Sequence, residues 1–296
     1  MSDQRVDLMR GGSGFIAALD QSGGSTPKAL ERYGVSNDAY SNDDEMFDVV
    51  HEMRVRIMKD EAFNRPRILG AILFEGTMQR DVEDVPTSRY LWQQKGILPF
   101  LKVDKGLADE SDGVQLMKPF ADDLDARLQE ARDLEMFGTK MRSVIHSSNS
   151  AGIQAIVEQQ FDYARQILAA GLVPIVEPEI DIHAADKAEC ESKLRTELRQ
   201  GLDTLEPGDA IVFKLTLPET SGFYHEFSDH PSVLRVAALS GGYSQEESNA
   251  RLTSNSNMIA SFSRALTEHL RVQQSNEEFT NALDSAIGGI AAASAT

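Results

Sequence analysis

Eight short apolar runs, separated by segments with helical periodicity, constrain the fold of this chain more than any other feature of its sequence. The runs span residues 15–20, 68–75, 97–103, 139–145, 172–180, 210–215, 234–240 and 258–264. Most of them are continuous rather than alternating, which is typical of parallel strands that are buried on both faces.

Helical patterns lie between several of these runs. Apolar side chains recur at the helical period from Ile153 to Leu168, and Gly171 is placed to end that helix. Residues 190–205 and residues 47–57 show the same period, and Ser244 with Glu247 resembles a capping box. Strands that alternate with helices predict an α/β fold. The count of eight favours a single (β/α)8 TIM barrel, with residues 1–296 forming one domain, over a doubly wound open sheet.

Charged side chains stand where strands of such a barrel would end, and there they face the active site. The first two runs end at Asp20 and Glu75, and the fifth contains Glu177 and Glu179. Six cations occupy similar positions. Five of them belong to the third, fourth, sixth and eighth runs, and Lys105 lies in the loop after the third: Lys102, Lys105, Lys140, Arg142, Lys214 and Arg264.

The whole chain has 29 Lys and Arg against 47 Asp and Glu, a net charge of −18. Such acidity argues against nucleic acid or an anionic membrane as a partner. A cluster of cations in so acidic a chain therefore predicts a basic pocket for a small polyanion. Ser240, Gly241 and Gly242 end the seventh run, and Arg264 ends the eighth, which is the usual barrel site for phosphate.

Lys214 interrupts an otherwise apolar run, and a buried lysine needs a partner or a task. One interpretation is a barrel-interior lysine paired with a carboxylate. The other is a nucleophile that loses its proton and forms a Schiff base with a carbonyl group. Glu177 and Glu179 lie two residues apart and share a strand face, so one can act as general acid or base while the other pairs with a lysine. The alternative is that these carboxylates only neutralise nearby lysines.

Several classes of site are disfavoured. Cys190 is the only cysteine, and none of the six histidines belongs to an HxH or HExxH motif, so we expect no metal site and no cofactor. The sequence contains no GxxxxGK[ST] loop and no GxSxG elbow. We expect a cytoplasmic protein, since we find neither a signal peptide nor a membrane span.

The motifs FIAALDQSGGSTPKAL, ILGAILFE, PFLKVDKG, GTKMRS, LVPIVEPEI, FKLTLPE, VAALSGGYS and ASFSRAL resemble class I fructose-bisphosphate aldolase, in order from about residue 11 to residue 270. The pattern is most similar to the short bacterial branch. The resemblance implies metal-independent, reversible cleavage of fructose 1,6-bisphosphate to dihydroxyacetone phosphate and glyceraldehyde 3-phosphate, in glycolysis and gluconeogenesis.

The resemblance also implies roles for individual residues. Lys214 matches the Schiff-base lysine, Glu177 the acid/base glutamate, and Asp20 the aspartate that assists proton transfer and carbon–carbon cleavage. Lys140 and Arg142 match the lysine and arginine that serve the substrate and its phosphate. The remaining substrate-binding positions are Ser25, Lys102, Ser240, Gly241, Gly242 and Arg264. How Glu177, Lys140 and Asp20 divide the proton transfers stays open.

Three other functions remain as alternatives. A Schiff-base barrel that acts on another phosphorylated ketose, such as tagatose bisphosphate, would use the same pocket. A non-catalytic phospho-sugar binding protein would need Arg264 and the Ser-Gly-Gly loop but not Lys214, Glu177 and Asp20 together. A metal-dependent aldolase is disfavoured by the missing histidine motif. The acidic surface favours a monomer or a small homo-oligomer.

Overall fold

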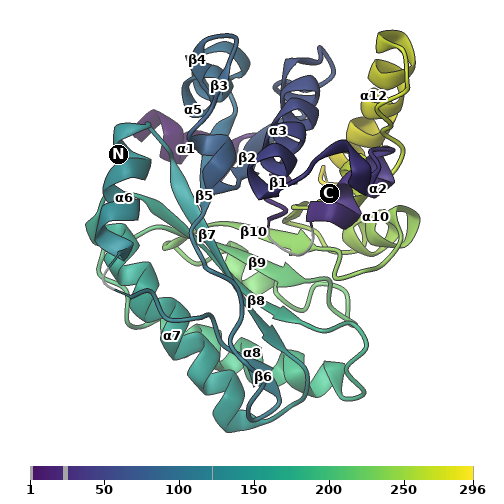
Figure 1. Ribbon diagram of the computed structural model, residues 1–296. Coiled ribbons are helices and arrows are strands. Elements are labelled where there is room, and N and C mark those ends of the chain that lie inside the picture. Colours follow the sequence, from purple (N-terminus) through teal and green to yellow (C-terminus); the bar gives the residue numbers. More distant parts are fainter. Residues whose placement is uncertain (1–2, 23–25, 122, 296) are drawn as a thin grey trace.

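The computed structural model describes residues 3–22, 26–121 and 123–295. Within these ranges, eight parallel strands follow the sheet order β1-β2-β5-β7-β8-β9-β10-β11, which is also their order along the chain. The ring closes where β1 lies beside β11, and just after β11 the Phe262 carbonyl accepts a hydrogen bond from the Ala18 N–H at 3.4 Å. Helices surround the strands, so the architecture is a (β/α)8 barrel (Figure 1).

The eight barrel strands have the following bounds: β1 Phe15–Leu19, β2 Ile68–Leu73, β5 Leu98–Lys102, β7 Gly138–Ile145, β8 Val173–Ile180, β9 Ile211–Thr216, β10 Val233–Leu239 and β11 Met258–Ala260. Three short strands lie outside this ring: β3 Asp81–Val82, β4 Val85–Pro86 and β6 Val114–Gln115.

The helices have the following bounds: α1 Asp3–Gly11, α2 Thr26–Tyr33, α3 Asp43–Lys59, α4 Glu75–Met78, α5 Thr87–Arg89, α6 Leu124–Asp133, α7 Ser150–Ala169, α8 Lys187–Leu202, α9 His225–Ser228, α10 Gln245–Thr253, α11 Arg264–Thr267 and α12 Asn276–Ala293. Two short turns, η2 Asn37–Ala39 and η3 Tyr90–Gln94, complete the elements.

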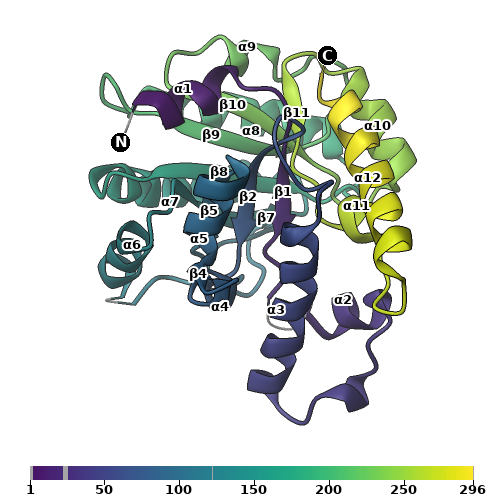
Figure 2. The same cartoon turned by 90° about the horizontal axis from the view of Figure 1, so that it is seen from above.

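Two apolar layers enclose the strands. The larger lies between the strands and the outer helices, and Figure 2 shows α2 and α3 side by side on that outer side. The smaller fills the amino-terminal half of the barrel interior with alternate strand residues, among them Ile16, Phe100 and Ile175. Met9 of α1 is fully buried in this inner layer, so α1 covers the floor of the barrel. Helix α1 is held there by Arg235, which donates to the Met9 and Gly12 carbonyls.

The fold confirms the predicted barrel, since all eight apolar runs become parallel strands. The helix expected from Ile153 is α7, and Gly171 follows it with φ +79°. The second predicted helix extends too far, because α8 ends at Leu202 and Leu205 lies beyond it. Ser244 caps α10, but the Glu247 carboxylate bonds Arg251 instead of the cap, so the capping box is only half formed.

Two boundaries are wrong at residues with charged side chains. The second strand ends at Leu73, and Glu75 is the first residue of α4. The eighth strand ends at Ala260, and Arg264 is the first residue of α11. The apolar pattern continued past the strand because residues 261 and 262 are also buried. Arg264 therefore reaches the pocket from a short helix and not from a strand.

Candidate active site

The carboxyl-terminal end of the barrel opens into a pocket of about 1350 Å³. Among the described residues, ten Lys or Arg and six Asp or Glu side chains line it. All six cations predicted from the strand ends belong to this lining: Lys102, Lys105, Lys140, Arg142, Lys214 and Arg264. An acidic protein thus concentrates positive charge in one cavity, which suits an anionic ligand.

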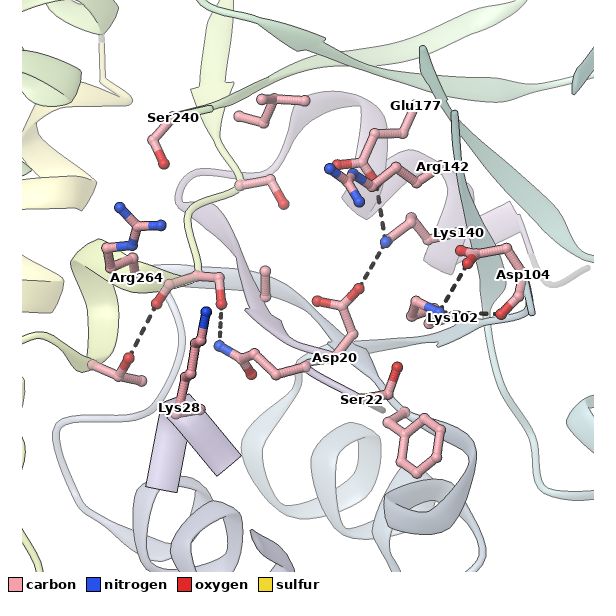
Figure 3. Close-up of a pocket in the computed structure, with 18 of the residues that line it drawn as sticks. Asp20, Ser22, Lys28, Lys102, Asp104, Lys140, Arg142, Glu177, Ser240 and Arg264 are labelled. Atoms are coloured by element: carbon pink, nitrogen blue, oxygen red, sulfur yellow. Dashed lines mark hydrogen bonds and ion pairs between the residues drawn. The ribbon is translucent and has the colours of Figure 1, made fainter. Parts of the chain in front are cut away.

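At the base of the pocket, four charged side chains form a continuous chain of ion pairs. Lys214 Nζ lies 3.0 Å from Glu177 Oε1, and Lys140 Nζ lies 3.1 Å from Glu177 Oε2. Lys140 Nζ also lies 2.7 Å from Asp20 Oδ2 (Figure 3). Lys214, Glu177 and Lys140 are 4%, 3% and 3% exposed. Glu177 is therefore shared by two buried ammonium groups.

Strand alternation and register bring these residues together. Asp20 follows Ile16 and Ala18 of β1, Glu177 follows Val173 and Ile175 of β8, and Lys214 follows Val212 of β9. Side chains two apart on a strand point to the same face, so each charge continues the inward face of its strand.

Neighbouring strands supply the lateral contacts. In the strand register, Lys140 of β7 lies opposite Lys102 of β5, and Arg142 of β7 lies opposite Glu177 of β8. The register therefore places Lys140 and Arg142 at the carboxyl-terminal end of the barrel, where both line the pocket.

The ion pairs fix the charge states of two of these groups. Burial by itself would raise the pKa of Asp20, but Lys140, Lys214 and Lys102 outweigh that effect and hold the pKa well below its usual value. Burial would likewise lower the pKa of Lys140, but Asp20, Glu177 and Asp104 raise it above the usual value. At neutral pH Asp20 is thus a carboxylate and Lys140 an ammonium group.

Further contacts hold Glu177 and Glu179. The Glu177 N–H donates to Gln160 Oε1 at 2.8 Å, so a buried side chain of α7 fixes the backbone beneath the carboxylate. Glu179 accepts a hydrogen bond from Arg142 Nε. The expected division between the two glutamates is therefore only partly right, because Glu179 pairs with an arginine rather than a lysine.

The other predicted feature is the turn after β10. Tyr243 N donates to the Ser240 carbonyl at 3.0 Å, and Gly241 and Gly242 have φ angles of +61° and +126°. A Cβ on Gly241 would lie 2.6 Å from Ile182 Cγ2, so both space and backbone angle require glycine there. Within the described residues, neither glycine N–H donates a hydrogen bond. Successive free N–H groups in such a turn form an anion-binding concavity.

The cations of the pocket fall into two groups. Lys102 lies 2.8 Å from Asp104 Oδ1, and Arg127 lies 2.7 Å from Glu75 Oε2. By contrast, Lys28 and Arg264 form no ion pair or hydrogen bond within the part of the chain that the structure describes. Figure 3 shows these two on the side of the pocket away from Lys102 and Asp104. The unpaired charges and the glycine turn mark the stronger anion site.

Sequence reasoning missed several residues of the pocket. Lys28 and Arg32 lie four residues apart on α2, and both line the cavity. Their helical spacing after the first strand was a usable signal. Ser261 is buried with an unpartnered hydroxyl in the described structure, and no local pattern distinguishes it. Of the predicted site residues, Ser25 lies outside the described residues.

Two kinds of feature are absent from the described residues. No group of three or more His, Cys, Asp and Glu side chains there could hold a metal ion. No helix in the described chain is long and apolar enough to cross a membrane.

Comparison with known proteins shows the family to which this chain belongs. The model of the class-I fructose-bisphosphate aldolase family matches residues 2–198. That segment includes Asp20, Lys102, Lys140, Arg142 and Glu177, whereas Lys214 lies beyond it.

Two solved structures resemble the fold. The first is fructose-bisphosphate aldolase from Plasmodium falciparum in complex with TRAP and a small-molecule inhibitor. It has a TM-score of 0.79 and 21% identity, over 98% of this chain and 93% of that chain. The second is Cgl0159 from Corynebacterium glutamicum, with a TM-score of 0.54 and 12% identity, over 99% of this chain and 92% of that chain. At these identities the likeness concerns the fold alone.

Proposed function

This chain belongs to the class I fructose-bisphosphate aldolase family, and on that premise we propose that it reversibly cleaves fructose 1,6-bisphosphate to dihydroxyacetone phosphate and glyceraldehyde 3-phosphate. Family membership makes it an aldolase that acts through a lysine Schiff base. The choice of substrate and the assignment of Lys214 as that lysine are our proposals.

One observation carries the assignment: Glu177 lies between two buried lysines at the carboxyl end of the barrel, 3.0 Å from Lys214 Nζ and 3.1 Å from Lys140 Nζ. A lysine must lose a proton before it attacks a carbonyl carbon, and a carboxylate at hydrogen-bond distance can accept that proton. Lys140 keeps its proton, because its acidic neighbours raise its pKa. Lys214 is therefore the better nucleophile of the two.

The proposed reaction follows from this placement. The Lys214 amine attacks C2 of the open-chain ketose, and Glu177 returns a proton as the carbinolamine loses water. The resulting iminium withdraws the electron pair of the C3–C4 bond as that bond breaks, while the Glu177 carboxylate accepts the proton of the C4 hydroxyl and the aldehyde leaves. Protonation of the enamine at C3 and hydrolysis of the imine then release dihydroxyacetone phosphate and free Lys214.

Two features support a substrate with at least one phosphate group. The glycine turn with Arg264 offers free N–H groups and a guanidinium to one phosphate. Lys28, which is also unpaired within the described residues, adds positive charge on the same side of the pocket. Binding of both phosphates would align the sugar chain with Lys214.

The remaining expectations belong to the same proposal. We place the enzyme in the short bacterial branch of the family, in glycolysis and gluconeogenesis, as a cytoplasmic monomer or small homo-oligomer. A substrate panel tests the choice of sugar. We expect the highest kcat/KM with fructose 1,6-bisphosphate, and an equal value with tagatose 1,6-bisphosphate would contradict selectivity between these epimers.

Borohydride trapping tests the mechanism. The protein is incubated with dihydroxyacetone phosphate in EDTA, reduced and digested, and the modified peptide is identified by mass spectrometry. We expect one stable adduct, on Lys214, and none in Lys214→Met. Lys187 of α8 serves as an internal control, because it is also buried but is paired with Glu191 of the same helix and with Glu219 after β9. A folded protein that binds the ligand without forming an adduct would indicate a phospho-sugar binding protein.

A further inference from the structure

The largest fully buried side chain in the described structure is an arginine. Arg54 of α3 is 1% exposed. Its guanidinium donates to Thr77 Oγ1 at 2.6 Å and to the Gln21 carbonyl. No carboxylate lies within ion-pair distance of it in the described residues. A buried cation with only neutral acceptors is costly, so its presence calls for an explanation.

The nearest compensating charge belongs to the candidate active site. Burial lowers the pKa of Arg54 to about 10, and the negative charge of Asp20 opposes that decrease. Arg54 is therefore still protonated at neutral pH. Asp20 therefore interacts with two cations: Lys140, which lies 2.7 Å from its carboxylate, and Arg54, which is bound to the next residue along the chain.

Gln21 links Arg54 to Asp20. It directly follows Asp20 after the end of β1, and its carbonyl accepts from Arg54. Its side chain donates to Ser263 Oγ, in the segment between β11 and α11. The residue after the catalytic carboxylate is thus held from two sides, by α3 and by the segment that precedes Arg264.

A second arginine of α3 shows what a purely structural role looks like. Arg56 donates to the Val272 and Gln274 carbonyls and lies over the ring of Phe279, at 4.1 Å from its centroid. It fastens α3 to the segment before α12. Arg54 makes no such contact and instead holds the chain beside the ion-pair chain of the pocket.

We propose that Arg54 is a positioning residue, which holds Asp20 against Lys140 by fixing the Gln21 backbone through its carbonyl. The kinetic part of this inference rests on the proposed function, because it assumes that Asp20 assists the chemical step. The geometric part does not.

The test compares Arg54→Met with Arg56→Met. For Arg54→Met we expect kcat to fall about 10- to 100-fold while KM changes less than about threefold, since a small displacement of a catalytic group has effects of this size. For Arg56→Met we expect a lower Tm with kcat within about twofold of wild type. Arg54→Lys keeps the charge but not the planar fork, so its kcat should lie between wild type and Arg54→Met. A merely structural Arg54 would lower Tm in the same way as Arg56 and leave kcat of the folded enzyme unchanged.

A crystal structure of Arg54→Met gives a readout independent of activity. We expect Asp20 to move away from Lys140 and Gln21 to lose its bond to Ser263. If both contacts persist, the proposal is wrong, whatever the enzyme proves to catalyse. Should wild type fail the trapping experiment, this structure still decides the role of Arg54.

Thr77→Val covers the case in which Arg54→Met does not fold. It removes one acceptor of the guanidinium and preserves the shape of the side chain. We expect kcat to fall about two- to fivefold with KM unchanged. Wild-type kcat in a folded Thr77→Val would overturn the inference.

Discussion

The two halves of the barrel interior are built from the same strands and differ completely in chemistry. The amino-terminal half is apolar and includes Ile16, Phe100, Ile175 and Val212. The carboxyl-terminal half, reached by continuing along the same inward faces, holds Asp20, Lys102, Lys140, Glu177 and Lys214. One step of the strand alternation, about 7 Å, separates the two halves.

This difference shows how a barrel can bury charges. The apolar half is closed from below by Met9 of α1, so it supports the strands without admitting water. The charged half places each ammonium group beside a carboxylate, and these pairs offset the cost of removing the charges from water. We therefore expect stability to depend mainly on the apolar half, and activity on the charged half. Substitutions in each half test that separation.

Lys214→Met should have the largest effect. The methionine side chain continues the apolar inward face of β9 by one position. Glu177 keeps its contact with Lys140. We expect kcat/KM to fall by on the order of 10⁴-fold or more, because the proposed nucleophile is gone. Thermal unfolding should show a Tm close to that of wild type. Substantial residual activity would mean that another lysine forms the imine.

Phe100→Ala should show the opposite pattern. The ring fills the apolar half beside Gly138, where a Cβ would lie 2.8 Å from Phe100 Cε1. Removing it should reduce the free energy of unfolding by about 3–5 kcal/mol, through lost transfer energy and a residual cavity. Urea unfolding measures this loss, and kcat of the folded enzyme should change little. A large fall in kcat with little loss of stability would break the proposed separation.

Arg264→Ala tests the unpaired cations of the pocket. We expect KM for the bisphosphate to rise about 10- to 100-fold, since a hydrogen bond to a charged group contributes roughly 1.5–3 kcal/mol. Arg127→Ala is the matched control, because Arg127 lines the same pocket but is bound to Glu75. Its KM should change far less. Equal effects of the two substitutions would show that pairing does not decide which cations bind phosphate.

The smallest expected effect concerns Asp20 and acid stability. Its pKa lies below the usual value in the folded protein, so its ion pair stabilises the fold above about pH 4 and this contribution is lost as the pH falls further. Asp20→Asn should therefore reduce the free energy of unfolding by on the order of 1 kcal/mol at pH 7. The difference from wild type should begin to shrink below about pH 4 and should persist in part at pH 3, because the pKa in the folded protein lies well below the usual value. Urea unfolding across this range measures it, and a constant difference would exclude Asp20 as its source.

Much of the fold was predictable from local pattern. Continuous apolar runs form strands and 3.6-residue periods form helices because burial along one element depends on its own side chains. Charges such as Lys214 could be recognised because a lysine inside an apolar strand conflicts with its surroundings. Where burial continued past a strand, as before Arg264, the same reasoning set the boundary too late.

What the sequence by itself determined was the number of strands, the positions of charge at their ends and the resemblance of the motifs to one family. Only the tertiary structure decided that Glu177 lies between Lys214 and Lys140, that Glu179 pairs with Arg142, and that Arg54 reaches Gln21. The reason is physical. Alternation along one strand fixes which face a side chain occupies, whereas contacts between strands depend on register and closure, which are set by segments far apart in the chain.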